Sequence, residues 1–413
     1  MMNIIAKIKK NGLVWLFNTL MNKVIIKCNT VVYYVCRLIP INDKKIIFES
    51  EGDLSDNSFA LYEYMLQHNY LGEYKVIWAV NNLKEAKLNN YPYTKFVNRF
   101  DNILDIKRSF HLATAKYFVY DHYNLMWYLK KRKEQIILNL WHGVGYKAIK
   151  NGNDTTNIKT QFDYFDSLSD DISLEFLKEF LNCSPQKGVV LGYPRLDYFF
   201  KTNLTARKYI KKIAGNTKVL LWMPTFRQSI NPELSEEYAD SETGLPIVYT
   251  SKDIEELNNY LHKKEVTLIL KMHHLQAELN VFKKKYTNIK FISDEELRDN
   301  NIQLYQFVAE TDALITDYSS IAIDYLLLDK PIIFTLDDYD DYKKSRGFYK
   351  DNIKELMPGY HIYNYDEFIK AISEVSSEKD LYSEERYKVL PMYHKFRDGN
   401  SSRRVLEFLN IER

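Results

Sequence analysis

The clearest structural signal in this chain is Ala313-Leu-Ile-Thr-Asp-Tyr-Ser-Ser-Ile-Ala-Ile-Asp-Tyr-Leu-Leu-Leu-Asp-Lys-Pro-Ile-Ile-Phe334. It opens with an apolar run, Ala313 to Ile315, which predicts a buried strand of a parallel sheet. Residues with capping side chains follow, then apolar residues recur at helical spacing. Pro331 ends that helix before a second strand, Ile332 to Phe334. The segment is therefore predicted to form one βαβ unit.

The turn of this unit carries four polar residues at the carboxyl end of its first strand: Thr316, Asp317, Ser319 and Ser320. Ligands bind at that edge of open α/β sheets, because the free amides and the dipole of the next helix favour anions. Two serines beside those amides point to a phosphate or diphosphate. Ordinary helix capping explains the same residues equally well, so both interpretations stay open.

The composition is that of a globular protein with room for two domains. A chain of 413 residues can bury two separate cores. Its 57 Lys and Arg nearly balance its 55 Asp and Glu, which argues against a nucleic-acid-binding protein. The cysteines, Cys28, Cys36 and Cys183, show neither metal spacing nor a disulfide framework, and this favours a reducing compartment.

Residues 1–42 differ from the rest, because they contain basic residues and no acidic one. The apolar residues on one helical face are Leu13, Leu16, Phe17, Leu20 and Val24. Neither uncharged run approaches the ~20 residues needed to span a bilayer. A basic amphipathic segment lying on an anionic cytoplasmic leaflet is the favoured interpretation. A helix packed on the body of the protein is the alternative.

Residues 43–204 alternate strand and helix patterns, which predicts a doubly wound, mostly parallel sheet. The apolar run Ile136 to Leu140 leads into Trp141-His-Gly-Val-Gly-Tyr-Lys147. His142 is therefore expected at the ligand-facing edge, where Gly143 lets a substrate approach the backbone. A histidine there is suited to act as a general base near neutral pH. A purely structural histidine fits the same pattern.

Two further strand ends in this half carry polar side chains. Asp121 and His122 follow one apolar run, but without neighbouring glycines they are interpreted as mainly structural. Arg195 lies in a sharp turn after another run, from which it can reach a phosphate or an acidic partner. The basic helix expected from Thr205 to Lys212 marks the start of a second domain, residues 205–390.

In the second domain, two more strands end in polar or cationic residues. One runs into Pro224-Thr-Phe-Arg227 and the other into Lys271-Met-His-His274. Adjacent histidines in an extended chain point to opposite sides, so at most one faces the site. No third ligand has zinc spacing. The acidic residues within 337–341 are interpreted as a solvated loop rather than a metal site.

Several segments, in order, resemble the CDP-glycerol glycerophosphotransferase family of teichoic acid and capsule synthesis. The matching segments are Phe48-Glu-Ser with Ser55-Asp-Asn57, Trp141-His-Gly143, Gly192-Tyr-Pro-Arg195, Met223-Pro-Thr-Phe-Arg227, Lys271-Met-His273, Leu314-Ile-Thr-Asp-Tyr-Ser-Ser320 with Asp324, and Arg346-Gly-Phe-Tyr349. Each segment is weak alone, but the ordered set is specific and runs from about Lys45 to the carboxyl terminus. The chain departs from the family pattern at Val144 and at His274, where proline is usual.

The resemblance implies a GT-B fold, in which two Rossmann-like domains face each other across a cleft and the second holds most of the nucleotide. A C-terminal helix, within 391–413, is expected to pack back on the first domain. The implied enzyme is peripheral to the cytoplasmic face of the bacterial plasma membrane. A hydroxyl of a lipid-linked or polymeric acceptor attacks the β-phosphorus of CDP-glycerol, and CMP leaves.

On this hypothesis His142 is the general base and His273 assists the departing phosphate. Contacts with the diphosphate or nucleotide are assigned to Arg227, Lys271, Thr316, Asp317, Ser319, Ser320 and Asp324, with Gly143, Arg195 and Thr225 as further candidates. Positioning and fixed cations supply what phosphoryl transfer requires, so neither a metal nor a cofactor is expected. Nucleic acid is not an expected partner.

Other functions share these features. A GT-B glycosyltransferase with a nucleotide sugar has the same fold and diphosphate turn, and a CDP-ribitol-using enzyme has the same chemistry. A non-catalytic nucleotide-binding protein is less favoured, because binding alone needs neither His142 nor His273. The sequence leaves open primase against polymerase, teichoic acid against capsule, and the oligomeric state.

Overall fold

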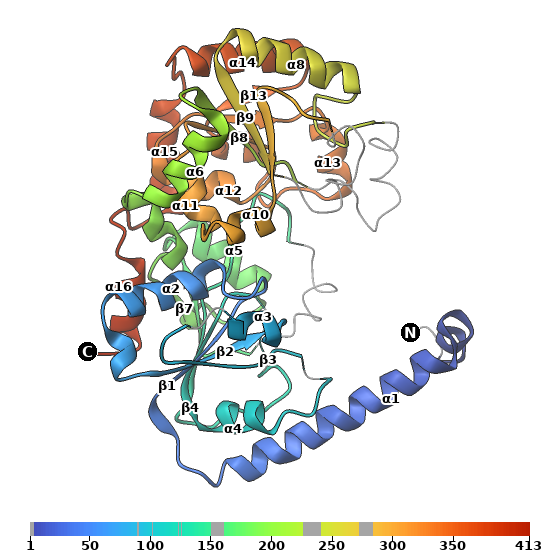
Figure 1. Ribbon diagram of the computed structural model, residues 1–413, viewed down its shortest axis with the longest axis vertical. Helices are drawn as coiled ribbons and strands as arrows, with labels where there is room; N and C mark the ends of the chain where they lie inside the picture. The colour runs from blue at the N-terminus through green and yellow to red at the C-terminus, as the bar shows by residue number, and fades with distance from the viewer. Residues whose placement is uncertain are drawn as a thin grey trace.

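The protein consists of two α/β units, each built on one parallel sheet, that lie one above the other along the long axis of the molecule (Figure 1). The computed structural model describes residues 4–88, 91–100, 102–122, 124, 126–149, 161–225, 241–271 and 284–413. Within these ranges, the expected alternation of strands and helices is confirmed.

The first unit has a seven-stranded sheet in the order β3-β2-β1-β4-β5-β6-β7, with every neighbouring pair parallel. Its strands are β1 (Asn42–Glu49), β2 (Lys75–Val80), β3 (Thr94–Asn98), β4 (Ala115–Tyr120), β5 (Ile136–Asn139), β6 (Tyr164–Ser167) and β7 (Gly188–Val190). Its helices are α2 (Asp56–Gln67), α3 (Leu83–Leu88), α4 (Ile106–Thr114) and α5 (Ile172–Phe180), with the 3-10 helices η1 (Tyr70–Gly72), η3 (Pro185–Lys187) and η4 (Pro194–Phe200). Consecutive residues Ile46, Ile47 and Phe48 are all buried, because helices cover both faces of the sheet.

The second unit repeats the design with six parallel strands in the order β10-β9-β8-β11-β12-β13. Its strands are β8 (Lys218–Trp222), β9 (Val266–Lys271), β10 (Ile289–Ile292), β11 (Ala313–Thr316), β12 (Ile332–Thr335) and β13 (Tyr360–Ile362). Its helices are α6 (Leu204–Ala214), α8 (Ser251–Lys263), α10 (Asp294–Asp299), α11 (Leu304–Ala309), α12 (Ile321–Tyr325), α13 (Tyr339–Ser345) and α14 (Tyr365–Ser376), with the 3-10 helices η5 (Leu326–Leu328) and η6 (Ile353–Leu356). Both strand orders reverse direction beside the first strand of the unit, which is the arrangement of doubly wound sheets.

The βαβ unit predicted over residues 313–334 is present as β11, α12 and β12. All four β11 residues are buried. The helix is shorter than its apolar spacing suggested, because it tightens into η5 after Tyr325 and ends at Asp329, whose φ is 47°. The turn between β11 and α12 is thereby fixed on both sides by buried structure.

Main-chain pairing joins the two units. Lys147 of the first unit forms an antiparallel bridge with Phe348 of the second. The amide of Ala148 donates to Gly347 O at 3.0 Å, and the amide of Tyr349 donates to Tyr146 O at 2.9 Å. One buried apolar cluster contains side chains of both units. The units therefore share a core at their interface.

The chain returns to the first unit through α15 (Ser383–Tyr393) and α16 (Ser401–Phe408). Val405 and Leu406 of α16 are buried in the core cluster of β1 and β2. Helix α16 begins at Ser401, within the segment 391–413 for which the sequence predicts a C-terminal helix. Its start is fixed by Asp197, whose carboxylate accepts hydrogen bonds from the amides of Ser401 and Ser402, both at 2.8 Å.

The N-terminal helix α1 (Ile4–Cys36) is kinked at Gly12 and projects away from the body of the molecule (Figure 1). Its carboxyl end is docked, because Asn29 and Tyr33 are buried and Asn29 hydrogen-bonds to the carbonyl of Ile103. The packed-helix interpretation therefore holds for this end. None of the described helices combines the length and apolar character that crossing a bilayer requires.

The opposite face of α1 leaves apolar side chains exposed. They recur at spacings of three or four residues, except for a gap of seven between Val24 and Val31: Val14, Phe17, Met21, Val24, Val31, Val35 and Leu38. The sequence predicted one apolar face for this helix. The structure instead shows two distinct sides: one side, with Asn29 and Tyr33, docks on the protein, and the other exposes a stripe of apolar side chains.

Candidate active site

The turn after β11 presents two serines at the interface between the units. Ser319 and Ser320 are half-buried, whereas the residues on either side of them are buried. The side chain of Ser320 makes no capping hydrogen bond to α12 within the described structure. The simple capping interpretation thus does not account for the Ser320 hydroxyl.

Other predicted residues of this turn hold the protein together. Thr316 donates to Met223 O at 2.7 Å. The Asp317 carboxylate accepts from the amide of Thr225 at 2.8 Å and from its hydroxyl at 2.5 Å. Asp317 is fully buried. Thr225, Thr316 and Asp317 therefore hold the loop after β8 against the serine turn. Their side chains support the site.

Gly143, from the first unit, lies directly against Ser320. A Cβ atom built on Gly143 would stand 3.0 Å from Ser320 Oγ and 3.2 Å from Ser320 Cβ. Gly143 also has φ 146°, which side-chain-bearing residues rarely adopt. The glycine that the sequence suggested for substrate approach thus allows close approach of the two units, and it brings His142 next to the serine turn.

A buried arginine joins the two sides of the interface. Arg195 is only 2% exposed, and its guanidinium pairs with Asp56 at 2.6 Å and with Asp324 at 2.8 Å. Asp324 belongs to α12 of the second unit and also accepts from the Tyr305 hydroxyl at 2.6 Å. The sequence allowed Arg195 to bind either a phosphate or an acidic side chain, and in the structure it binds acidic side chains. Arg195 and Asp324 are thus paired with each other.

The same arginine holds the backbone of the candidate base. Arg195 Nη2 donates to His142 O at 2.8 Å. Just before it, Trp141 has φ 53°, an unusual value for a bulky residue, and its carbonyl accepts from Asn57 Nδ2 at 2.7 Å. This left-handed residue turns the chain sharply after β5, and the surrounding hydrogen bonds hold the turn.

The imidazole of His142 has a defined tautomer. Its Nδ1 lies 3.0 Å from the carbonyl oxygen of Asp121, which only accepts, so Nδ1 carries the proton. In the neutral ring the lone pair is then on Nε2, which makes no hydrogen bond to any residue in the described part of the chain. Burial, followed by the charge on His122, lowers the pKa of His142 to about 4. The ring is thus neutral at pH 7, as a general base requires.

Sequence reasoning missed the residue that lies against this base. The rings of His122 and His142 are stacked, with centroids 3.9 Å apart and an angle of 7° between the planes. His122 Nδ1 lies 2.9 Å from Asp121 Oδ1, and its Nε2 lies 2.9 Å from Glu51 Oε2. Although burial opposes it, hydrogen bonding to Asp121 and Glu51 raises the pKa of His122 to about 10. The only signal in the sequence was its place at a strand end.

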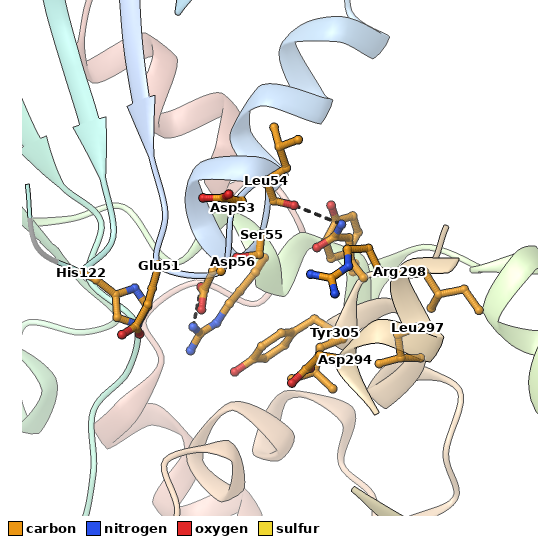
Figure 2. A pocket seen from close by; sticks show the side chains of 16 residues that line it. Glu51, Asp53, Leu54, Ser55, Asp56, His122, Asp294, Leu297, Arg298 and Tyr305 are labelled. Carbon is orange, nitrogen blue, oxygen red and sulfur yellow. Dashed lines mark hydrogen bonds and ion pairs between the residues drawn. The ribbon is translucent and has the colours of Figure 1, made fainter. Parts of the chain in front are cut away.

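A cavity of about 360 Å³ opens beside this pair, between the loop before α2 and helices α10 and α11 (Figure 2). Glu51 and His122 lie together at one side of it, and Tyr305 and Asp294 lie across from them. Its lining combines carboxylates with the cations His122, Arg195 and Arg298. The carboxylates can accept hydrogen bonds from hydroxyl groups, so the cavity suits a hydroxyl-rich part of a substrate.

Of the remaining predicted site residues, one is described by the structure and the others are not. Lys271 ends β9 and pairs with Asp294 at 2.9 Å, with only 10% of its side chain exposed. Arg227, His273 and His274 lie outside the described residues. Among the residues that are described, no group of three or more metal-ligating side chains is present.

The sequence of the chain matches one protein family over nearly its whole length. Residues 31–410 match the model of the CDP-Glycerol:Poly(glycerophosphate) glycerophosphotransferase family. The chain belongs to this family. Membership places it among the glycerophosphotransferases, so the family resemblance and the expected enzyme class are confirmed.

Two curated relatives and one solved structure illustrate the match. The teichoic acid poly(glycerol phosphate) polymerase of Bacillus spizizenii is 28% identical over 417 residues, covering 93% of this chain and 96% of the relative. The teichoic acid ribitol-phosphate primase of the same organism is 26% identical over 396 residues, covering 90% and 92%. The wall teichoic acid polymerase TagF superposes with a TM-score of 0.75 at 20% identity, covering 96% and 97%. The last likeness confirms the expected GT-B fold.

The Arg195 contacts generate a stability prediction. Arg195→Met leaves Asp324 buried without its cation, so we expect the free energy of unfolding to fall by about 3–5 kcal/mol. The control is Arg207→Met, which breaks an ion pair to Glu310 in which the arginine is 62% exposed. That loss should stay below about 1 kcal/mol. Urea denaturation measures both, and equal losses would contradict a special role for Arg195.

Proposed function

We propose that this protein transfers glycerol phosphate from CDP-glycerol to a hydroxyl of a lipid-linked or polymeric acceptor in teichoic acid synthesis. Membership in the glycerophosphotransferase family supports the reaction class. The observation that supports the mechanism is the contact between Gly143 and Ser320, because Gly143 follows the candidate base His142 in the chain and Ser320 belongs to the serine turn of the other unit.

In the proposed reaction, the acceptor hydroxyl oxygen bonds to the β-phosphorus of CDP-glycerol while its proton passes to His142 Nε2. The bond from that phosphorus to the oxygen bridging the two phosphates breaks, and CMP leaves. The hydroxyls of Ser319 and Ser320 bind the diphosphate. Lys271 and Arg227 supply positive charge, and His273 assists the leaving phosphate. These groups provide the positioning and charge stabilisation that phosphoryl transfer needs, without a metal or other cofactor.

We assign the other predicted residues to the frame of the site. Thr225, Thr316 and Asp317 hold the loop and the serine turn in register, and Asp324 holds Arg195. In this proposal their substitution acts through geometry. The cavity beside His122 receives a polyol portion of a substrate, because its carboxylates can accept hydrogen bonds from hydroxyl groups.

We further propose that α1 places the enzyme on the cytoplasmic leaflet of the plasma membrane. Its exposed stripe of apolar residues runs along the side away from the docked Asn29 and Tyr33. Lys23 and Lys27 are exposed nearby, and residues 1–42 contain no acidic side chain. Two copies of such a helix would repel each other, whereas an anionic lipid surface attracts both the charges and the stripe.

A donor panel tests the reaction and the base together. Wild-type protein with a synthetic lipid acceptor should release CMP from CDP-glycerol, with less turnover of CDP-ribitol and none of UDP-glucose. His142→Ala should lower turnover by at least about 100-fold, since it removes the proton acceptor. Binding of CDP-glycerol, measured by calorimetry, should change little.

The control for that panel is His68→Ala, which alters a histidine stacked on Tyr64, away from the interface. It should retain normal turnover. Release of UDP in place of CMP would overturn the proposed donor. Near-normal turnover of the His142 variant would remove His142 from the mechanism.

The membrane proposal predicts binding to vesicles that contain phosphatidylglycerol. Placing Glu at both Phe17 and Val24 should weaken binding at least about tenfold, because two apolar contacts are lost and two negative charges are added. The matched control places the same charges at Asn18 and Asn22, which are exposed beside the stripe. Equal binding by both double variants, or a dimer in light scattering that only the first pair dissociates, would contradict the membrane assignment.

A further inference from the structure

We propose that His122 is a positioning residue for catalysis: an imidazolium, clamped between Glu51 and Asp121, that lies flat on His142 and holds it as a neutral base. The inference rests on the proposed function for the role of His142. It goes beyond that function in assigning a second histidine, and a carboxylate from the loop before α2, to the operation of the base.

The hydrogen bonds of His122 define its charge. Each of its ring nitrogens lies 2.9 Å from a carboxylate oxygen, one from Asp121 and one from Glu51. Ionised carboxylates only accept, so with both acids ionised each ring nitrogen donates a proton, and a ring with two N–H groups is an imidazolium. Burial raises the pKa of Asp121, and the hydrogen bond from His122 opposes that effect. The clamp is itself held, because Arg99 donates to the carbonyl of Glu51 at 3.1 Å and the amide of Ser58 donates to Asp121 at 3.0 Å.

The stack fixes the orientation of His142. Its ring is stacked on His122 with centroids 3.9 Å apart, and it also contacts Trp141, with centroids 4.2 Å apart and the planes tilted by 33°. Asp121 contacts both histidines, since its carboxylate accepts from His122 and its carbonyl accepts from His142 Nδ1. One residue therefore sets the charge of the first ring and the tautomer of the second.

The stack also makes a second positive charge unfavourable. A proton on His142 would place two cations face to face at 3.9 Å. The charged groups around His142 from the packed elements are His122, Asp56, Arg195 and Glu51. His122 makes the largest contribution and Arg195 acts in the same direction, whereas the carboxylates of Asp56 and Glu51 oppose them. Burial and these charges together keep the pKa of His142 near 4.

This arrangement has a consequence for each turnover. The proton that His142 accepts from the acceptor hydroxyl arrives as the new O–P bond forms, and the negative diphosphate in the cleft offsets the charge at that moment. Once CMP has left, the imidazolium of His142 again faces that of His122. The proton is then expelled to water, and the base is restored in its neutral form.

The test follows the protonation of His142 directly and does not depend on turnover. In full-length protein with labelled histidine, NMR should give His142 a midpoint near 4. His122→Phe keeps a flat ring and removes its charge, so the midpoint should rise by at least one pH unit toward the ordinary value of about 6.5. The acid limb of kcat/KM should move upward by the same amount.

Two further variants complete the experiment. Glu51→Gln removes one arm of the clamp from a side chain that is 61% exposed, so it should fold, and it should lower the midpoint at which His122 loses its proton. His68→Phe makes the same change at a histidine whose ring contacts Tyr64 and should shift nothing. An unchanged His142 midpoint in His122→Phe overturns the proposal, as does a wild-type His122 that loses its proton near pH 6.5.

The outcomes also separate this inference from the proposed function. Loss of activity at every pH with an unmoved His142 midpoint assigns His122 to structure alone and overturns the positioning role. A shifted midpoint in a protein that never releases CMP supports the histidine pair and instead contradicts the proposed reaction.

Discussion

The site depends on the guanidinium of Arg195, which is buried between carboxylates from both halves of the molecule. It pairs with Asp56 at the start of α2 and with Asp324 in α12. A buried ion pair repays its desolvation only when the geometry is good and its remaining hydrogen-bonding groups are satisfied. Here the two Nη atoms bond to the carboxylates and Nη2 also donates to the carbonyl of His142, whereas the buried Nε has no hydrogen-bond partner among the described residues. The interaction that joins the two sheets therefore also sets the position of the base.

The charged groups near the Arg195 ion pairs include both cations and carboxylates. A cationic His122 lies against a neutral His142, and the Lys271 side chain, only 10% exposed, ends β9, two strands from β11 in the second sheet. Carboxylates and cations are mixed around the cavity next to Glu51, where Asp294 pairs with Lys271. Hydroxyl groups can donate to the carboxylates there.

The features predicted correctly from the sequence are those that depend on residues close together in the chain. The βαβ unit of residues 313–334, the parallel sheets and the strand-end location of His142 all follow from apolar runs, proline and capping residues that are close together in the chain. The pairing of Arg195 with Asp324 joins residues 129 positions apart, and no periodicity encodes it. Because the partner of a polar side chain depends on packing, its role was uncertain even where its position was predicted.

The histidine pair is a second feature that the sequence predicts only in part. His122 and His142 follow the neighbouring strands β4 and β5, so their proximity follows from the order of strands in the sheet. Their stacking and the carboxylate clamp, however, depend on the loop that carries Glu51. The start of α16 is a further case, since its cap comes from Asp197 in η4. Hydrogen bonds between residues far apart in the sequence therefore determine both the histidine clamp and the start of α16.

A crystal structure of His142→Ala with CDP-glycerol bound tests the central claim most directly. The account predicts the diphosphate at the serine turn, with phosphate oxygens about 2.7–3.2 Å from the Ser319 or Ser320 hydroxyls and the β-phosphorus on the side of residue 142. A diphosphate bound away from that turn, with the β-phosphorus beyond reach of residue 142, would contradict it.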